Sequence, residues 1–193
     1  MKYFSQLKAA LFLVCLIPFG RLLWYGYFNQ LGANPIEFIT RSLGTWTLVI
    51  LLVTLSITPL RNRLNWPWLI KLRRMFGLFT FFYALLHFIT YIWLDQFFDI
   101  GSIFMDVIKR PFITIGFAAF ILLIPLALTS TNAMIKRLGG KRWLLLHKLV
   151  YIIAIFAVIH YWWLVKKDIT QPAIYSAVLL ILLGYRVIKP KLK

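Results

Sequence analysis

Three histidines occupy positions where a side chain inside a membrane could bind a metal. His87, His147 and His160 lie in stretches that otherwise resemble membrane helices, and His147 and His160 share one stretch, thirteen residues apart. Ionisable side chains are costly in hydrocarbon and tend to be functional there. These stretches hold almost no carboxylates, so an imidazole is left with another helix or a metal as its partner. Haem iron takes histidine ligands from facing helices, and the pattern therefore predicts a membrane electron carrier.

The composition indicates what kind of scaffold positions these histidines. The chain has 193 residues, of which 62% are hydrophobic and 14% are charged, whereas a soluble domain is about a quarter charged. This predicts an integral membrane protein with a single domain over residues 1–193. The only cysteine, Cys15, excludes an internal disulfide and a cysteine metal cluster.

Six apolar segments predict an all-α fold, a six-helix transmembrane bundle. Each has about 17 to 20 residues, the length a helix needs to cross about 30 Å of hydrocarbon. Turn signals such as Asn34-Pro35 and Gly139-Gly140 separate them. Lys2 and Lys8 before the first segment would also suit a cleavable signal peptide, but no clear cleavage site follows and we interpret it as a retained helix. The segments lie near residues 9–27, 43–60, 75–94, 111–129, 143–164 and 172–188.

The charges predict the orientation of the bundle. The acidic residues lie in the loops after segments 1, 3 and 5, whereas the other loops and both termini carry only basic charges. By the positive-inside rule, both termini are cytoplasmic. The net charge of +17 is then mainly a topology signal that also suits anionic lipid, and no nucleic-acid partner is predicted. The five acidic residues are Glu37, Asp95, Asp99, Asp106 and Asp168.

Depth in the membrane pairs two of the histidines. His87 and His160 fall at similar depth in the outer halves of two parallel segments, so they are expected to ligate one haem. His147 lies roughly 20 Å deeper, and Arg73, fourteen residues before His87, is the residue that would face it. On a straight helix His147 and His160 are about 140° apart, so either the helix bends or they face different neighbours. Structural interpretations remain: His160 in an aromatic belt, and His147 at the inner interface or donating to a carbonyl.

The ordered set of short motifs resembles the MsrQ (YedZ) family, which belongs to the ferric-reductase-like transmembrane group. No single motif is very specific, but together they run in order along most of the chain. They are GANPIE (32–37), GTW (44–46), LSITPLR (55–61), RRMFG (73–77), YALLH (83–87), KRPFITIG (109–116), PLALTS (125–130), LG (138–139) and WLLLHKLVY (143–151), followed by His160.

The resemblance implies an electron-transfer subunit in the bacterial inner membrane. Such a subunit binds haem b, one or two per chain, and FMN. It takes electrons from the quinone pool, with quinol as the donor. It passes them to a periplasmic molybdopterin reductase, MsrP, which forms a heterodimer with it. That partner reduces methionine sulfoxide in oxidised periplasmic proteins.

The resemblance also assigns residues. It makes His87, His147 and His160 the candidate ligands of haem iron. The wider group uses two histidines on each of two helices, and Arg73 stands where the fourth would be. Arg73 and Arg74 are candidate cofactor-binding residues that would neutralise haem propionates or a quinone-derived anion, or they only set the topology. No glycine-rich nucleotide motif locates FMN.

Two other functional classes stay open on the sequence alone. One is a stand-alone ferric-reductase-type haem protein, which the absence of a flavin domain in this sequence disfavours. The other is a polytopic transporter with structural histidines, which the lack of acidic residues within the spans disfavours. The outer loop 95–110, which carries Asp95, Asp99 and Asp106, is a candidate docking surface for a partner.

Overall fold

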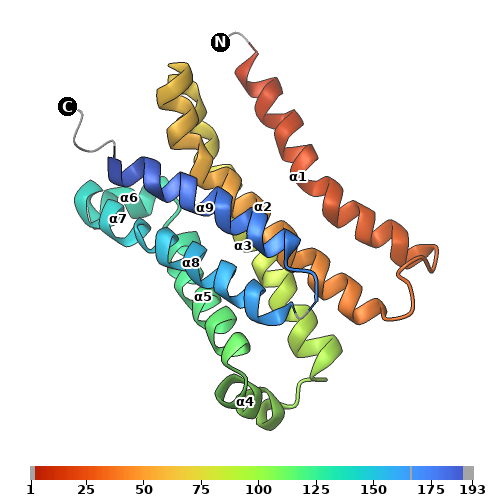
Figure 1. Ribbon diagram of the computed structural model, residues 1–193. Helices are drawn as coiled ribbons and strands as arrows, with labels where there is room; N and C mark the ends of the chain where they lie inside the picture. The colour runs from red at the N-terminus through yellow and green to blue at the C-terminus, as the bar shows by residue number, and fades with distance from the viewer. Residues whose placement is uncertain (1–2, 166, 189–193) are drawn as a thin grey trace.

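The computed structural model describes residues 3–165 and 167–188, and this part of the chain is helical and contains no strand (Figure 1). Six helical stretches are long and apolar enough to cross a membrane, which confirms the predicted six-helix transmembrane bundle. The helices are α1 (Phe4–Tyr27), α2 (Pro35–Leu64), η1 (Pro67–Leu72), α3 (Arg73–Thr90), η2 (Tyr91–Asp95), α4 (Ile100–Lys109), α5 (Pro111–Leu128), α6 (Asn132–Leu138), α7 (Gly140–His147), α8 (Leu149–Leu164) and α9 (Thr170–Ile188).

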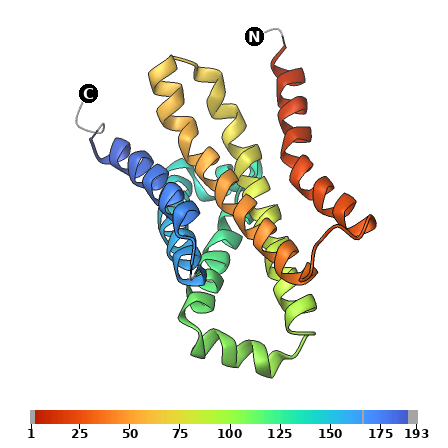
Figure 2. The same cartoon turned by 45° about the vertical axis from the view of Figure 1, so that its right-hand side comes forward.

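Two helix pairs form the centre of the bundle. α2 packs along α3, and α5 packs along α8, and these two pairs are the most extensive helix contacts in the described chain. α9 covers α8 and α2, whereas α1 lies at the edge beside α2 and α3 (Figures 1 and 2). The core between the two pairs is made of aliphatic side chains, among them Leu51, Leu55, Leu123, Ile153 and Val158.

The second helix is longer than its apolar segment. The sequence predicts a span over 43–60, whereas α2 runs from Pro35 to Leu64. Its start is set by polar groups that hydropathy does not register: the Asn34 side chain accepts a hydrogen bond from the amide of Glu37 at 3.2 Å, and Pro35 occupies the first turn. Arg61 and Arg63 suit the negative end of the helix dipole in its last turn.

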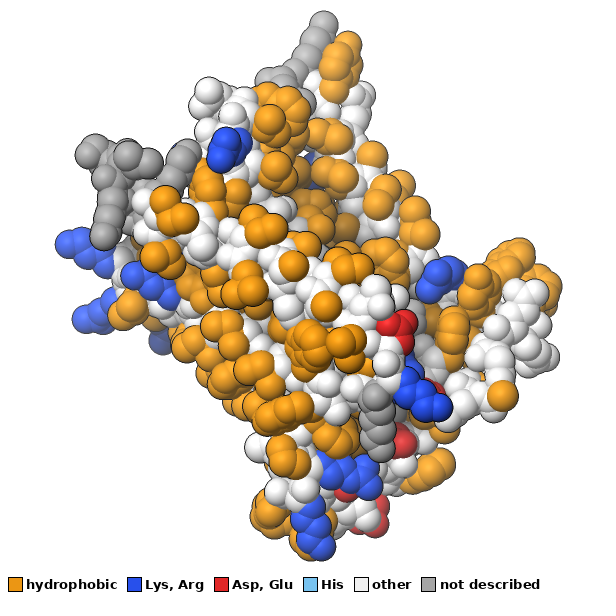
Figure 3. Space-filling model, viewed as in Figure 1, with side chains coloured by type: hydrophobic (Ala, Val, Ile, Leu, Met, Phe, Trp, Pro, Cys, Tyr) orange, Lys and Arg blue, Asp and Glu red, His pale blue; other side chains and the backbone are white. Residues whose placement is uncertain are grey.

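The two ends of the bundle differ in charge. One end, here called the acidic end, holds all five acidic residues, and the opposite basic end holds Arg61, Arg73, Arg137 and Lys141 among others. On the face shown in Figure 3, acidic side chains appear only toward the end where α4 lies, whereas the end with α6 and α7 shows only basic ones. Apolar side chains cover the surface between the two ends, as a membrane-spanning bundle requires.

Side chains from other helices bond to the backbone at or next to prolines in two membrane helices. In α1, next to Pro18, the Tyr83 hydroxyl donates to the Cys15 carbonyl at 2.6 Å and accepts from the Phe19 amide at 3.2 Å. An uninterrupted helix would join those two backbone groups directly. In α2, Pro59 has no amide for the Leu55 carbonyl, and a guanidinium N–H of Arg186 on α9 donates to that carbonyl instead.

The fully buried hydroxyl of Tyr83 holds α1 onto α3, so its removal should weaken the fold. Tyr83→Phe is expected to lower the free energy of unfolding by about 1–3 kcal/mol, because a buried carbonyl and amide lose their partner. Denaturation in detergent, followed by circular dichroism, measures the change. Tyr27→Phe is the control because that ring is exposed. Equal stability of the two variants would show that the bridge contributes nothing.

Candidate functional site

A cavity of about 610 Å³ lies between the two central helix pairs, toward the acidic end. This volume falls within the range of about 300–1,000 Å³ that is usual for cofactor and ligand sites. Its walls come from α2, α3, α5 and α8, and they are mostly apolar, with Leu48, Ala84 and Phe120 among them. Its charged groups lie at the rim: Glu37, Arg41, Asp95 and Arg110.

His87 and His160 meet in this cavity, as their predicted depth requires. His87 comes from α3 and His160 from α8, and the centroids of the two imidazole rings are 6.2 Å apart. The ring planes make an angle of 76°. Histidine–metal bonds are about 2 Å long, and a ring nitrogen lies about 1 Å from its ring centre, so two imidazoles on opposite sides of one metal ion have centroids about 6 Å apart. The spacing therefore fits one metal ion between the rings.

Backbone carbonyls determine which nitrogen of each ring carries the proton. Nδ1 of His87 lies 2.8 Å from the carbonyl oxygen of Thr40 on α2, and Nδ1 of His160 lies 2.6 Å from that of Phe112 on α5. A carbonyl can only accept, so each Nδ1 donates. In the neutral ring Nε2 then keeps its lone pair, which is the state a metal ligand needs.

A glycine one turn beyond each accepting carbonyl lies under the ring. Gly44 follows Thr40 by four residues on α2, and Gly116 follows Phe112 by four residues on α5. A Cβ at position 44 would lie 3.0 Å from Cε1 of His87, and one at position 116 would lie 2.7 Å from Nδ1 of His160. The α2–α3 and α5–α8 pairs thus repeat one local arrangement, although no internal repeat is evident in the sequence.

His147 lies apart from this pair, at the basic end. Thr129 donates its hydroxyl proton to the Pro125 carbonyl at 2.6 Å, so the 3.1 Å contact between Thr129 Oγ1 and His147 Nε2 has the imidazole as donor. The Trp143 ring stacks on His147 at 3.9 Å, and its indole N–H donates to the Thr129 carbonyl at 2.9 Å. His147 is therefore held by a hydrogen-bonded cluster, with Nε2 used as a donor.

Of the two alternatives for His147 and His160, a bent helix or different neighbours, the structure shows a break in the helix. The segment predicted over 143–164 is divided at Lys148 into α7 and α8. This break lets His160 contact Phe112 at the start of α5 while His147 contacts Thr129 just beyond its end. Both histidines thus face the same neighbouring helix, which a straight helix would not allow at thirteen residues' separation.

The two arginines that are candidates for cofactor binding, Arg73 and Arg74, have different surroundings. Arg73 begins α3, is half-buried, and lies close enough to His147, Tyr151 and Arg186 to interact with them electrostatically. Arg74 is exposed, and its guanidinium donates to the Asn132 side chain at 2.8 Å. Only Arg73 therefore faces the interior of the bundle.

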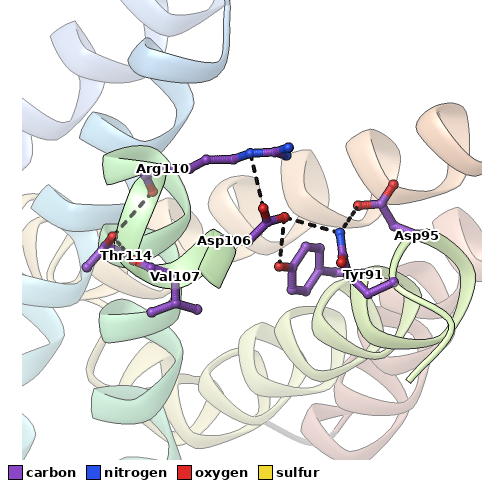
Figure 4. A network of polar contacts seen from close by, with 7 residues as sticks. Tyr91, Asp95, Asp106, Val107, Arg110 and Thr114 are labelled. Atoms are coloured by element: carbon purple, nitrogen blue, oxygen red, sulfur yellow. Dashed lines mark hydrogen bonds and ion pairs between the residues drawn. The ribbon is translucent and has the colours of Figure 1, made fainter. Parts of the chain in front are cut away.

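A polar network closes part of the cavity rim at the acidic end (Figure 4). The Asp106 carboxylate pairs with Arg110 at 3.2 Å and accepts from the Tyr91 hydroxyl at 3.3 Å and the Gln96 amide at 3.1 Å. The loop 95–110, predicted as a docking surface, contains the helix α4. The Asp106 side chain on this helix is only 16% exposed. The Asp106 carboxylate thus stabilises the rim, and docking of a partner at this loop stays a prediction.

Asp99 also has a structural role in that loop. Its carboxylate caps α4, accepting from the Ser102 hydroxyl at 2.8 Å and the Ser102 amide at 3.1 Å. These hydrogen bonds lower the pKa of the Asp99 carboxyl below its ordinary value. The large side chains Ile100, Phe104 and Ile108 are exposed on the other side of this helix.

Within residues 3–165 and 167–188, no group of three or more His, Cys, Asp or Glu side chains is placed to hold a metal ion. Two histidines on opposite sides would need further donors in the plane between them. A porphyrin supplies four such donors, and an apolar cavity lined by aromatic rings such as Phe88, Phe117 and Phe120 suits its faces. The donor set and the cavity therefore fit a haem.

Comparisons with known proteins agree with this geometry. Residues 43–158 match the family model described as "Ferric reductase like transmembrane component". The chain is 59% identical over 185 residues to the "Protein-methionine-sulfoxide reductase heme-binding subunit MsrQ" of Herminiimonas arsenicoxydans. The matched region covers 95% of this chain and 85% of that protein. The chain is 52% identical to the subunit of the same name from Ralstonia nicotianae over 188 residues, which covers 96% and 87% of the two chains.

Proposed function

This chain belongs to the MsrQ family, and on that premise we propose that it is a haem b subunit that carries electrons across the bacterial inner membrane to a protein-methionine-sulfoxide reductase. The observation that carries the proposal is the pair of imidazoles from α3 and α8, 6.2 Å apart, each with Nδ1 bound to a carbonyl. His87 and His160 would hold the haem iron, and the haem would supply a one-electron carrier at that position.

The protein's own residues set the conditions around the iron. Thr40 and Phe112 hold the two ring nitrogens that face away from the metal, which keeps the other nitrogens unprotonated. Apolar side chains such as Leu51, Ala119 and Ile153 exclude water from the cavity, and burial of this kind is one of the levers on haem potential. The network of Tyr91, Asp106 and Arg110 holds the rim in place.

The distribution of charges supports the direction of electron transfer that we propose. The basic end, with both termini, faces the cytoplasm by the positive-inside rule, and the haem site lies toward the acidic, periplasmic end. Electrons from the quinone pool, with quinol as donor, enter near Arg73, and they leave at the periplasmic side to the molybdopterin partner MsrP, which repairs oxidised proteins. The subunit and its partner form a heterodimer, and the catalytic step belongs to the partner.

The arrangement at the basic end favours one haem rather than two. His147 has Arg73 in place of a second histidine, and its Nε2 is engaged by Thr129. FMN, which the family resemblance implies, has no recognisable nucleotide motif here. Arg73 with Arg186 is a pair of neighbouring cations that would suit its phosphate.

Absorption spectra of the purified protein test the proposed haem site. Oxidised and dithionite-reduced spectra with a pyridine haemochrome assay should show haem b at about one per chain. The reduced protein should then be reoxidised when the methionine sulfoxide reductase and its substrate are added together. Freshly purified protein without a Soret band would refute the proposal. Reduced haem that is not reoxidised when the reductase and its substrate are added would refute the assigned partner.

A further inference from the structure

We propose that Gly44 and Gly116 are positioning residues that hold the two imidazole planes nearly perpendicular at the iron. The inference rests on the proposed haem site between His87 and His160. It adds the orientation of the ligand rings, the residues that impose it, and a spectroscopic consequence.

Each ring is held by two contacts from one neighbouring helix. Nδ1 of His87 donates to the Thr40 carbonyl, and the same ring lies against the backbone at Gly44, one turn further along α2. Nδ1 of His160 donates to the Phe112 carbonyl, and that ring lies against Gly116 on α5 in the same way. A hydrogen bond at one ring atom and a steric surface along the ring leave an imidazole little freedom to rotate.

The distances show that a Cβ would crowd both rings, and His160 more severely than His87. A Cβ at position 116 would lie 2.7 Å from Nδ1 and 2.8 Å from Cε1 of His160, which is closer than nonbonded atoms approach. At position 44 the corresponding distances to His87 are 3.2 Å and 3.0 Å, so that ring would have to move by less. Helix interiors disfavour glycine, and at positions 44 and 116 the nearness of the rings gives glycine a specific reason.

The His87 ring is held by α2 and the His160 ring by α5, and the two ring planes make an angle of 76°. Parallel axial imidazoles both interact with one of the two iron d orbitals that extend out of the porphyrin plane, so the energies of those orbitals separate. Perpendicular imidazoles each interact with a different orbital and leave the energies nearly equal. The ferric low-spin haem is then expected to give an EPR spectrum dominated by one feature at large g, rather than three well-separated features.

The experiment compares EPR spectra and haem content in four glycine variants. Gly44→Ala and Gly116→Ala should replace the large-g feature with a more rhombic spectrum and shift the midpoint potential. Gly116→Ala should also lose more haem than Gly44→Ala. Gly77→Ala and Gly184→Ala are matched controls on α3 and α9, because a Cβ at either position meets nothing within 4 Å. Both controls should keep the spectrum and haem content of the unsubstituted protein.

The outcomes separate this inference from the haem assignment. Unsubstituted protein without haem b refutes the proposed function, and with it this inference. Haem b with a three-feature spectrum in the unsubstituted protein refutes the perpendicular arrangement alone. If Gly116→Ala cannot be purified, Gly44→Ala decides, since its ring needs only a small shift. An unaltered spectrum and potential in Gly44→Ala would then overturn the positioning role.

Discussion

His87→Ala and His160→Ala are each expected to leave the purified protein without haem b. Both imidazoles face the same cavity, and each is the only histidine on its side of the proposed iron position. Removing either ring leaves one axial bond and a void in an apolar wall, and no neighbouring His, Cys, Asp or Glu in the described residues completes a metal site. Loss of the Soret band, measured against protein concentration, is the expected result.

His147→Ala is the matched comparison for these two variants. It removes an imidazole from the same helical stretch, but at the basic end and within the Trp143–Thr129 cluster. We expect it to retain haem in full, with some loss of thermal stability because Thr129 loses a hydrogen-bond partner. Half the haem content in this variant would establish a second haem and contradict the single-haem assignment. Retention of full haem by His87→Ala would contradict the ligand pair.

Arg73→Gln is expected to slow reduction of the haem by quinol about tenfold or more, with haem content unchanged. Arg73 is a half-buried cation close to His147, Tyr151 and Arg186. In the described residues the two ion pairs, Glu37–Arg41 and Asp106–Arg110, both lie at the acidic end. The Arg73 charge is thus available to a negative group on the donor. Hydrogen bonds to charged groups contribute about 1.5–3 kcal/mol, and the loss of that energy corresponds to a reduction rate that is lower by tenfold or more.

Arg74→Gln provides the control for that measurement. It is the next residue and has the same charge, but it is exposed and bonded to Asn132. Stopped-flow mixing of oxidised protein with a soluble quinol gives the rate for each variant, and dithionite reduction checks that the haem remains accessible. Equal rates for Arg73→Gln and the unsubstituted protein would assign Arg73 to topology alone.

Six membrane helices could be predicted from the sequence because each span is a long apolar segment, a property that needs no partner to be recognised. The pairing of His87 with His160 could be predicted from depth, since the rise per residue is nearly constant in a helix. The lateral neighbours could not be predicted in this way. Depth says nothing about which carbonyl accepts from a ring, and Thr40 and Phe112 are unremarkable in the sequence.

The role of Gly44 and Gly116 could not be predicted from the sequence. Both lie inside long apolar helices, where glycine has no evident local purpose. Their reason is a close approach between helices that only the packed structure shows. The break at Lys148 and the helix α4 were likewise beyond hydropathy, because they depend on caps and packing around short segments. That both termini are cytoplasmic stays a prediction from charge.

The Tyr83 bridge to α1 has a consequence for biosynthesis. The ribosome delivers α1 to the membrane before α3 exists, so the amide of Phe19 and the carbonyl of Cys15 can at first bond only to each other. That turn must open for the Tyr83 hydroxyl to enter, and opening it is costly once α1 is surrounded by hydrocarbon. Residence of α1 at the insertion site until α3 arrives is therefore favoured, and the first three helices are expected to enter the lipid as a unit rather than one by one.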